Sequence, residues 1–84
     1  MHKVRVKYRG QLAALTGAAE ETLEASTVEE LVRALGKRHG REAERQSRAM
    51  LITVNGESIL LLGGYKTALQ DGDVAGFFPL CAGG

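Results

Sequence analysis

The sequence predicts an α+β domain in which one main helix covers one face of a four- to five-stranded mixed sheet. Residues 3–9 alternate basic side chains with apolar and aromatic ones, which is the period of a half-buried strand. Residues 28–35 instead repeat apolar side chains at helical spacing, and short segments separated by turn signals follow residue 49. A single helix covers only one face of a sheet of this size, so we expect two layers.

The first expected strand is followed by a short connection and a second strand. Residues 11–16 read QLAALT, are mixed in character and are closed by Gly17, so we expect a loop with one helical turn. The second strand is expected at residues 20–25, antiparallel to the first.

The clearest helix begins after Thr27. Thr27 is a favourable N-cap residue, and Glu30 stands three positions later, which completes a capping box. Four apolar residues then follow the spacing of a core-facing stripe: Val28, Leu31, Val32 and Leu35. Gly40 ends the helix, and Gly36 weakens its last turn by about 1 kcal/mol relative to alanine. Residues 41–48 are polar all round, so they form either an exposed continuation of the helix or a mobile loop.

The third and fourth strands are expected to form a hairpin. The third covers residues 50–54. Asn55-Gly56 follows it, and these two residue types tolerate the positive φ that both central positions of a type I′ turn require. The fourth strand is expected over residues 57–62 and ends at Gly63-Gly64.

The last strand is expected over residues 74–79, after a tight turn at Asp71-Gly72-Asp73, and Pro79 ends it. The element order is therefore two strands, one helix, two strands, a connection and one strand. The β-grasp fold has this order, with its first and last strands parallel in the middle of the sheet. We expect residues 1–79 to form this domain and residues 80–84 to form a flexible tail.

Composition and charge argue against several classes of partner. The 84 residues include eleven basic and ten acidic ones, a net charge of +1, without the strongly basic footprint of nucleic-acid-binding proteins. The longest apolar run, Ile59–Leu62, is far too short to span a bilayer, and residues 1–10 lack the apolar core of a signal peptide. The single cysteine, Cys81, forms no internal disulfide. We therefore expect a cytoplasmic protein that binds neither nucleic acid nor membrane.

The usual templates for catalysis and metal binding are missing from the sequence. The two histidines, His2 and His39, lie far from each other and from Cys81, so a tetrahedral zinc site is not expected. Gly63-Gly64 lacks the lysine and the helix start of a phosphate-binding loop. We expect no metal site and no tightly bound cofactor.

An apolar partner surface is expected on the uncovered face of the sheet. If the apolar run forms a strand, alternate side chains point to opposite faces, and we assign Ile59 and Leu61 to the uncovered one. Of the adjacent rings Phe77 and Phe78, the first is expected to face inward and the second outward. An apolar patch of this kind marks a partner surface. The alternative is that a neighbouring segment covers it: residues 11–16 or 63–70.

The tail is the most informative segment. It reads Leu80, Cys81, Ala82, Gly83, Gly84. Gly83 and Gly84 have no Cβ, so they can thread a narrow channel in another protein and present a sterically bare carboxylate. Cys81 has no neighbouring histidine, lysine or arginine to lower its thiol pKa, so we do not expect it to act as a nucleophile. The Gly84 carboxylate is thus the expected reactive group, and the rest of the tail is expected to contact the partner.

The residues also resemble a known family. The end of the chain, LQDGDVAGFFPLCAGG, resembles the C-terminus of the MoaD/ThiS-type ubiquitin-like sulfur carriers, which include the small subunit of molybdopterin synthase. The segments ITVNG, LLGG and VRVKYRGQLAALTG are similar to sequences of this family and of archaeal ubiquitin-like modifiers. The resemblance covers nearly the whole chain, and the combined tail motif is specific.

The resemblance implies a ubiquitin-like β-grasp fold and a carrier cycle. An E1-like adenylyltransferase of the MoeB/ThiF type would adenylate the Gly84 carboxylate with ATP, and a sulfur donor would then replace AMP to give a thiocarboxylate. In molybdopterin synthase the tail inserts into the large subunit and donates its sulfur. The chain would then be a carrier and a non-catalytic subunit of a sulfurtransferase complex.

Two departures from the family pattern leave the partner open. Leu80 replaces the second proline of F-F-P-P, and Asp73-Val74 stands where an acidic residue commonly follows D-G-D, which leaves the strand register near Gly76 open. Other functions also fit the chain: a protein modifier joined through Gly84 to lysines, a sulfur carrier for thiamine, tRNA thiolation or cysteine synthesis, or a plain binding module.

Overall fold

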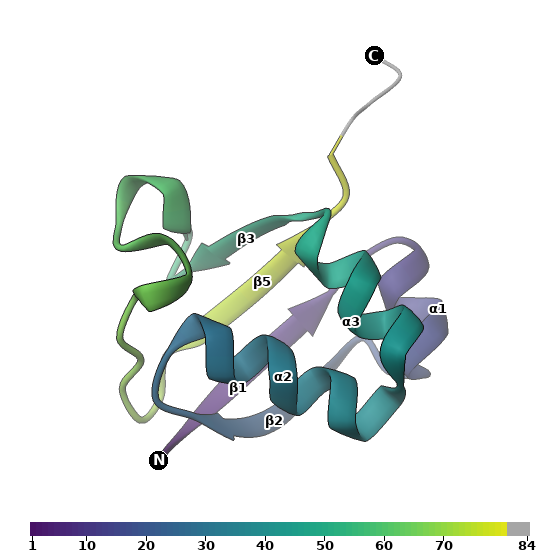
Figure 1. Cartoon of the computed structure of the whole chain (residues 1–84), viewed down its shortest axis with the longest axis horizontal. Helices are drawn as coiled ribbons and strands as arrows, with labels where there is room; N and C mark the ends of the chain where they lie inside the picture. Colours follow the sequence, from purple (N-terminus) through teal and green to yellow (C-terminus); the bar gives the residue numbers. More distant parts are fainter. Residues whose placement is uncertain (81–84) are drawn as a thin grey trace.

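The computed structural model describes residues 1–80, which contain a five-stranded sheet with the strand order β2-β1-β5-β3-β4 (Figure 1). Its strands are β1 His2–Tyr8, β2 Glu20–Ala25, β3 Leu51–Val54, β4 Glu57–Ser58 and β5 Val74–Phe78. The central strands β1 and β5 are parallel, and the other three pairs are antiparallel. This confirms the predicted order, with the first and last strands side by side in the middle.

Helices cover one face of the sheet, and α2 lies across it in Figure 1. The helical segments are α1 Gln11–Thr16, α2 Val28–His39, α3 Arg41–Arg48 and the 3-10 turns η1 Ile59–Leu61 and η2 Gly64–Lys66. Residues 11–16 form a short helix of their own, where we expected a loop with one turn, because Leu12 is fully buried and Gly17 closes the helix at φ 74°. Among residues 1–80, no helix combines the length and apolar character needed to cross a membrane.

The core lies between α2 and the sheet. The predicted helical stripe is confirmed, because its four residues are all fully buried: Val28, Leu31, Val32 and Leu35. On the sheet side the alternate residues Val4 and Val6 of β1 are fully buried, as is Phe77 of β5. Each such side chain contributes about 1.5–3 kcal/mol through removal of apolar surface from water. The two central strands therefore carry the core and hold the start of the C-terminal segment.

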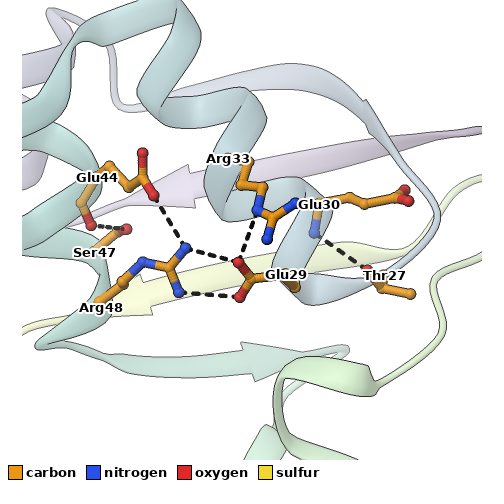
Figure 2. Close-up of polar contacts among 7 residues, drawn as sticks. All are labelled: Thr27, Glu29, Glu30, Arg33, Glu44, Ser47 and Arg48. Atoms are coloured by element: carbon orange, nitrogen blue, oxygen red, sulfur yellow. Dashed lines mark hydrogen bonds and ion pairs between the residues drawn. The ribbon is translucent and has the colours of Figure 1, made fainter.

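The predicted start and end of α2 are both confirmed. The Glu30 backbone N–H donates to Thr27 Oγ1 at 3.2 Å, and the Glu30 side chain reaches back to accept from the Ser26 N–H at 2.8 Å (Figure 2 draws the first of these bonds). Gly40, at φ 107°, ends the helix, and its N–H donates to the Gly36 carbonyl.

Residues 41–48 form a second helix, α3, that packs on α2. They are not exposed all round, since Ala43 is 1% exposed and Ser47 is fully buried. Ser47 Oγ donates to the Glu44 carbonyl at 2.7 Å, so burial leaves its hydroxyl satisfied. A Cβ on Gly36 would lie 2.8 Å from Glu44 Cβ, so this glycine permits the close approach of the two helices.

The predicted fourth strand over residues 57–62 is wrong beyond Ser58. β4 has two residues, which pair with Thr53 and Val54 across the Asn55-Gly56 turn. The turn itself is confirmed, with φ 52° at Asn55 and 86° at Gly56. Ser58 Oγ then accepts the Leu60 N–H at 3.2 Å and begins η1, so a local side-chain cap replaces the sheet ladder.

Candidate functional site

The C-terminal segment leaves the sheet on the side where both central strands, β1 and β5, have their C-terminal ends. β5 ends at Phe78, and we call the next two residues, Pro79 and Leu80, the tail root. Leu80 is 61% exposed. The predicted site residues Cys81, Ala82, Gly83 and Gly84 lie outside the described residues.

Residues 59–62, which we call the leucine loop, hold three of the six large apolar side chains that are exposed among residues 1–80. Leu60 and Leu61 are 83% and 75% exposed, and Leu62 is 42% exposed. Ile59 is only 5% exposed and belongs to the core, so its assignment to the partner surface is wrong. The error has a physical cause: the period of two fails once the chain turns into η1, and Leu60, Leu61 and the following Leu62 are all exposed.

The assignments of Phe77 and Phe78 to opposite sides are confirmed. Phe77 is fully buried, and Phe78 is half-buried. The strand register near Gly76, left open by the sequence, pairs Gly76 with Lys7 and Thr53. A Cβ on Gly76 would lie 2.6 Å from Phe78 Cε2, so the glycine leaves room for the Phe78 ring over the sheet.

An open groove separates the leucine loop from the tail root. It is lined by residues of α3, β3, both 3-10 turns and the tail root: Arg48, Met50, Leu51, Ile52, Ser58, Ile59, Leu60, Tyr65 and Leu80. Leu60 and Leu80, which both line the groove, are largely exposed. A partner that covers this groove contacts Leu60 of the leucine loop and Leu80 of the tail root at the same time.

Arg48 ties the helical layer to this groove. Its guanidinium donates two hydrogen bonds to Glu29 of α2, at 3.0 and 2.9 Å, and one to Glu44 at 3.0 Å (Figure 2). Its guanidinium carbon lies 5.4 Å from the ring centroid of Tyr65 in η2. Hydrogen bonds to Glu29 and Glu44 raise the pKa of Arg48, and the bond from Arg48 lowers the pKa of Glu29. Arg48 therefore stays charged and fixes Tyr65 beside the leucine loop.

Sequence reasoning missed several groove residues. Strand alternation placed Ile59 and Leu61, not Leu60, on the partner surface, and Arg48 and Tyr65 carry no motif. One available signal was Ser58, since a serine before an apolar run can cap a 3-10 turn through its hydroxyl. The position of Arg48 is tertiary and follows from the packing of α3 on α2.

The main titratable cluster of the described residues lies at the C-terminal end of α2. Glu21 Oε2 accepts the Tyr8 hydroxyl at 2.5 Å and lies 2.5 Å from His39 Nε2, while Arg38 Nε lies 3.3 Å from Oε1. Burial and the bond to Glu21 raise the pKa of Tyr8. Burial would raise the pKa of Glu21, but the bonds from Tyr8 and His39 outweigh it and lower this pKa. The cluster joins β1, β2 and α2, and its groups are occupied with one another.

Among residues 1–80, no group of three or more histidine, cysteine or acidic residues is arranged to hold a metal ion.

The sheet order, the covering helix and the exposed apolar groove beside the tail root define a ubiquitin-like β-grasp protein. The sequence model of the ThiS family matches residues 6–84, and the chain belongs to this family of ubiquitin-like sulfur carriers. Members of the family are small carrier proteins that are generally non-catalytic. Comparison with curated protein sequences found no match.

Solved structures support the same assignment. Small archaeal modifier protein 1 from Methanosarcina acetivorans is 25% identical, with a TM-score of 0.87 over 100% of this chain and 98% of that one. A putative molybdopterin converting factor subunit 1 from Pyrococcus furiosus is 29% identical, with a TM-score of 0.73 over 94% and 98%. A chain of the BexX/CysO complex from Amycolatopsis orientalis is 27% identical, with a TM-score of 0.83 over 96% and 99%.

Proposed function

We propose that this chain is the small subunit of molybdopterin synthase, a sulfur carrier that works through the carboxylate of Gly84. The observation that carries the proposal is the match to the ThiS family, which extends through the terminal Gly83-Gly84. The likeness to a molybdopterin converting factor subunit supports the choice of pathway. We place this activity in the cytoplasm, as expected for a carrier without a disulfide.

The reaction needs two steps that the carrier undergoes but does not catalyse. A Gly84 carboxylate oxygen attacks the α-phosphorus of ATP on an E1-like enzyme of the MoeB/ThiF type, and pyrophosphate leaves. A sulfur donor at the oxidation level of sulfide then attacks the acyl carbon of the adenylate, AMP leaves, and loss of the S–H proton to solvent gives the thiocarboxylate. ATP is thus a substrate of the activating enzyme and not a resident group of this chain.

The groove and the leucine loop supply what a carrier needs from its folded part. Leu60 offers exposed apolar surface in the groove that it shares with Leu80, and the exposed Leu61 follows it in the leucine loop. A partner must bind near the tail root in order to receive the tail. We propose that the activating enzyme and the large subunit of molybdopterin synthase both cover this surface. The half-buried Phe78 and the exposed Leu80 extend the contact to the tail.

The test is loading in solution. The chain is incubated with an E1-like enzyme, ATP and a sulfur donor, and its intact mass is measured. We expect an adenylate or a sulfur-for-oxygen exchange at Gly84. Deletion of Gly84 should stop loading and leave the free energy of unfolding within about 0.5 kcal/mol of wild type. Absence of both products in the wild-type chain would refute the carrier function. Sulfur transfer to an acceptor other than the large synthase subunit would assign the carrier to a different pathway.

A second candidate is a protein modifier joined through Gly84 to target lysines. The likeness to small archaeal modifier protein 1 favours it. The last basic residue of the chain is Lys66, so trypsin would leave residues 67–84 on a modified lysine rather than a short remnant. An Ala82→Arg variant would shorten the remnant to Gly-Gly, and detection of that remnant on target lysines would support conjugation.

A further inference from the structure

Two residues beyond the end of the parallel central pair, the chain segments that follow β1 and β5 meet. Tyr8 and Phe77 are the last paired residues of the two strands. Beyond them, a Cβ built on Gly10 would lie 3.2 Å from Pro79 Cγ, 3.7 Å from its Cβ and 3.8 Å from its Cδ. The pyrrolidine ring of Pro79 therefore lies against the Gly10 backbone, at the tail root.

Gly10 is held in place from its other side. It has φ 63° and ψ −141°, a region that residues with a Cβ rarely enter. Its carbonyl accepts the Ala13 N–H at 3.1 Å and begins α1, and α1 is anchored by the fully buried Leu12. The surface that Pro79 contacts is thus part of the folded domain.

Pro79 is stiff as well. Its ring fixes its own φ, and it restricts the preceding Phe78 to extended conformations. The Phe78 ring lies over Gly76, where a Cβ would come within 2.6 Å of it. The direction in which the chain leaves β5 is therefore limited by Phe78 on the sheet side and by Gly10 on the α1 side.

We propose that Gly10 and Pro79 are positioning residues, whose contact sets the direction of the tail root and hence the delivery of the Gly84 carboxylate. This inference rests on the proposed carrier function. Four residues follow Leu80, and four residues span at most about 14 Å. Because so little chain follows the tail root, a shift of the tail root also shifts the Gly84 carboxylate relative to the α-phosphorus of ATP. A misplacement of about 1 Å can lower the rate by a large factor.

The chain contains a matched control for a substitution at Gly10. Gly17, at the other end of α1, also has a positive φ, 74°, but a Cβ there would meet nothing within 4 Å. Gly17→Ala therefore strains the backbone at α1 without touching the tail root. Gly10→Ala combines backbone strain with the approach to the Pro79 ring.

A second variant separates the contact from the strain. Pro79→Ala removes Cγ, the ring atom closest to Gly10. If the contact matters, Gly10→Ala should slow the reaction less in the Pro79→Ala background than in the wild type, because the two substitutions act on one contact.

The kinetic test is pyrophosphate–ATP exchange catalysed by an E1-like enzyme, with each carrier variant as substrate. We expect Gly10→Ala to lower kcat by about tenfold or more, while KM changes by less than about twofold, because the leucine loop and the α3 side of the groove stay in place. Gly17→Ala should match the wild type. Equal kcat values for Gly10→Ala and Gly17→Ala, or additive effects of Gly10→Ala and Pro79→Ala, would overturn the inference.

A structural readout separates this inference from the proposed function. The orientation of the Leu80 N–H bond, measured from residual dipolar couplings, should change in Gly10→Ala and not in Gly17→Ala. An unchanged orientation in Gly10→Ala would overturn the inference even if the wild type is loaded. No exchange with the wild type, together with a changed orientation, would refute the carrier function and leave the contact as the determinant of tail direction.

Discussion

Neighbouring residues of the leucine loop have opposite roles, although they are chemically alike. Ile59 is 5% exposed and packs in the core, whereas Leu61, two positions later, is 75% exposed. The change comes from Ser58, whose hydroxyl caps η1 and turns the following residues away from the sheet. We therefore expect that stability and the proposed partner binding can be altered separately within four residues.

We expect Ile59→Ala to lower the free energy of unfolding by about 2–4 kcal/mol, because it removes buried apolar volume. Leu61→Ser should change that free energy by less than about 0.5 kcal/mol but weaken binding to the E1-like enzyme by about tenfold. Urea denaturation and titration calorimetry measure the two effects. A large loss of stability in Leu61→Ser, with unchanged affinity, would place Leu61 in the folded core and not at the partner surface.

Glu21 makes a pH-dependent contribution to stability. Its pKa in the folded chain is lowered, so the contribution is present above the unfolded pKa of about 4.5 and is lost as pH falls through the folded value. We expect Glu21→Gln to cost about 1–3 kcal/mol at pH 7, since Tyr8 and His39 lose a charged partner. The difference from wild type should shrink below about pH 4.5.

Urea denaturation between pH 3 and pH 7 checks this expectation. Glu24→Gln, on the exposed face of the same strand, is the control and should stay within about 0.5 kcal/mol of wild type at pH 7. A difference between wild type and Glu21→Gln that grows toward low pH would contradict the sign of the pKa shift.

At the scale of elements, the pairing of α2 and α3 depends on one glycine. Helix propensity alone treats Gly36 as a weakness of about 1 kcal/mol in the last turn of α2. In the structure a Cβ there would lie 2.3 Å from Glu44 Oε1 and 2.8 Å from Glu44 Cβ. The side-chain end can move, but Glu44 Cβ is fixed by α3, so the gap between the helices must open.

We therefore expect Gly36→Ala to destabilise the chain by about 1–3 kcal/mol, opposite in sign to the effect of propensity. Thermal denaturation followed by circular dichroism measures this. In a Glu44→Gly background, which removes the colliding atoms, the same substitution should be neutral or stabilising. A stabilising effect of Gly36→Ala in the wild-type background would show that α3 moves to accommodate the added methyl group without a loss of stability.

Local signals of the sequence predicted most of the fold, and tertiary contacts decided the remainder. Thr27, Glu30 and the Asn55-Gly56 turn act through neighbouring backbone groups, so the sequence alone predicted them correctly. Residues 41–48 read as polar all round because two small residues, Ala43 and Ser47, provide the buried side of α3. The predicted strand over 57–62 failed because its apolar run has no alternation that distinguishes a strand from a 3-10 turn.

The candidate site was predictable only in part. The direction of Phe78 follows from the sequence, since the strand alternates up to it, whereas the predicted site residues 81–84 lie outside the described residues. Arg48 and Tyr65 come together from segments separated by two strands, and neither carries a local signal. Their contact depends on the packing of the whole molecule.

Because the two central strands are parallel, the N-terminus and the tail root lie at opposite ends of these strands. β1 begins at His2, and β5 runs in the same direction and ends beside the end of β1 (Figure 1). Met1 is 80% exposed, so it has room for added residues. Additions before Met1 therefore lie at the opposite end of the central strands from the tail root.

This arrangement predicts opposite effects for two matched extensions. One alanine added before Met1 should leave loading unchanged, whereas one alanine added after Gly84 should lower it at least tenfold, because the activated carboxylate moves to a different residue. Both chains should melt within about 3 °C of wild type, since neither extension enters the core. Intact-mass measurement after incubation with the E1-like enzyme, ATP and a sulfur donor checks the loading. Equal loading of both extended chains would show that the activating enzyme does not read the position and identity of the last residue, which the carrier function requires.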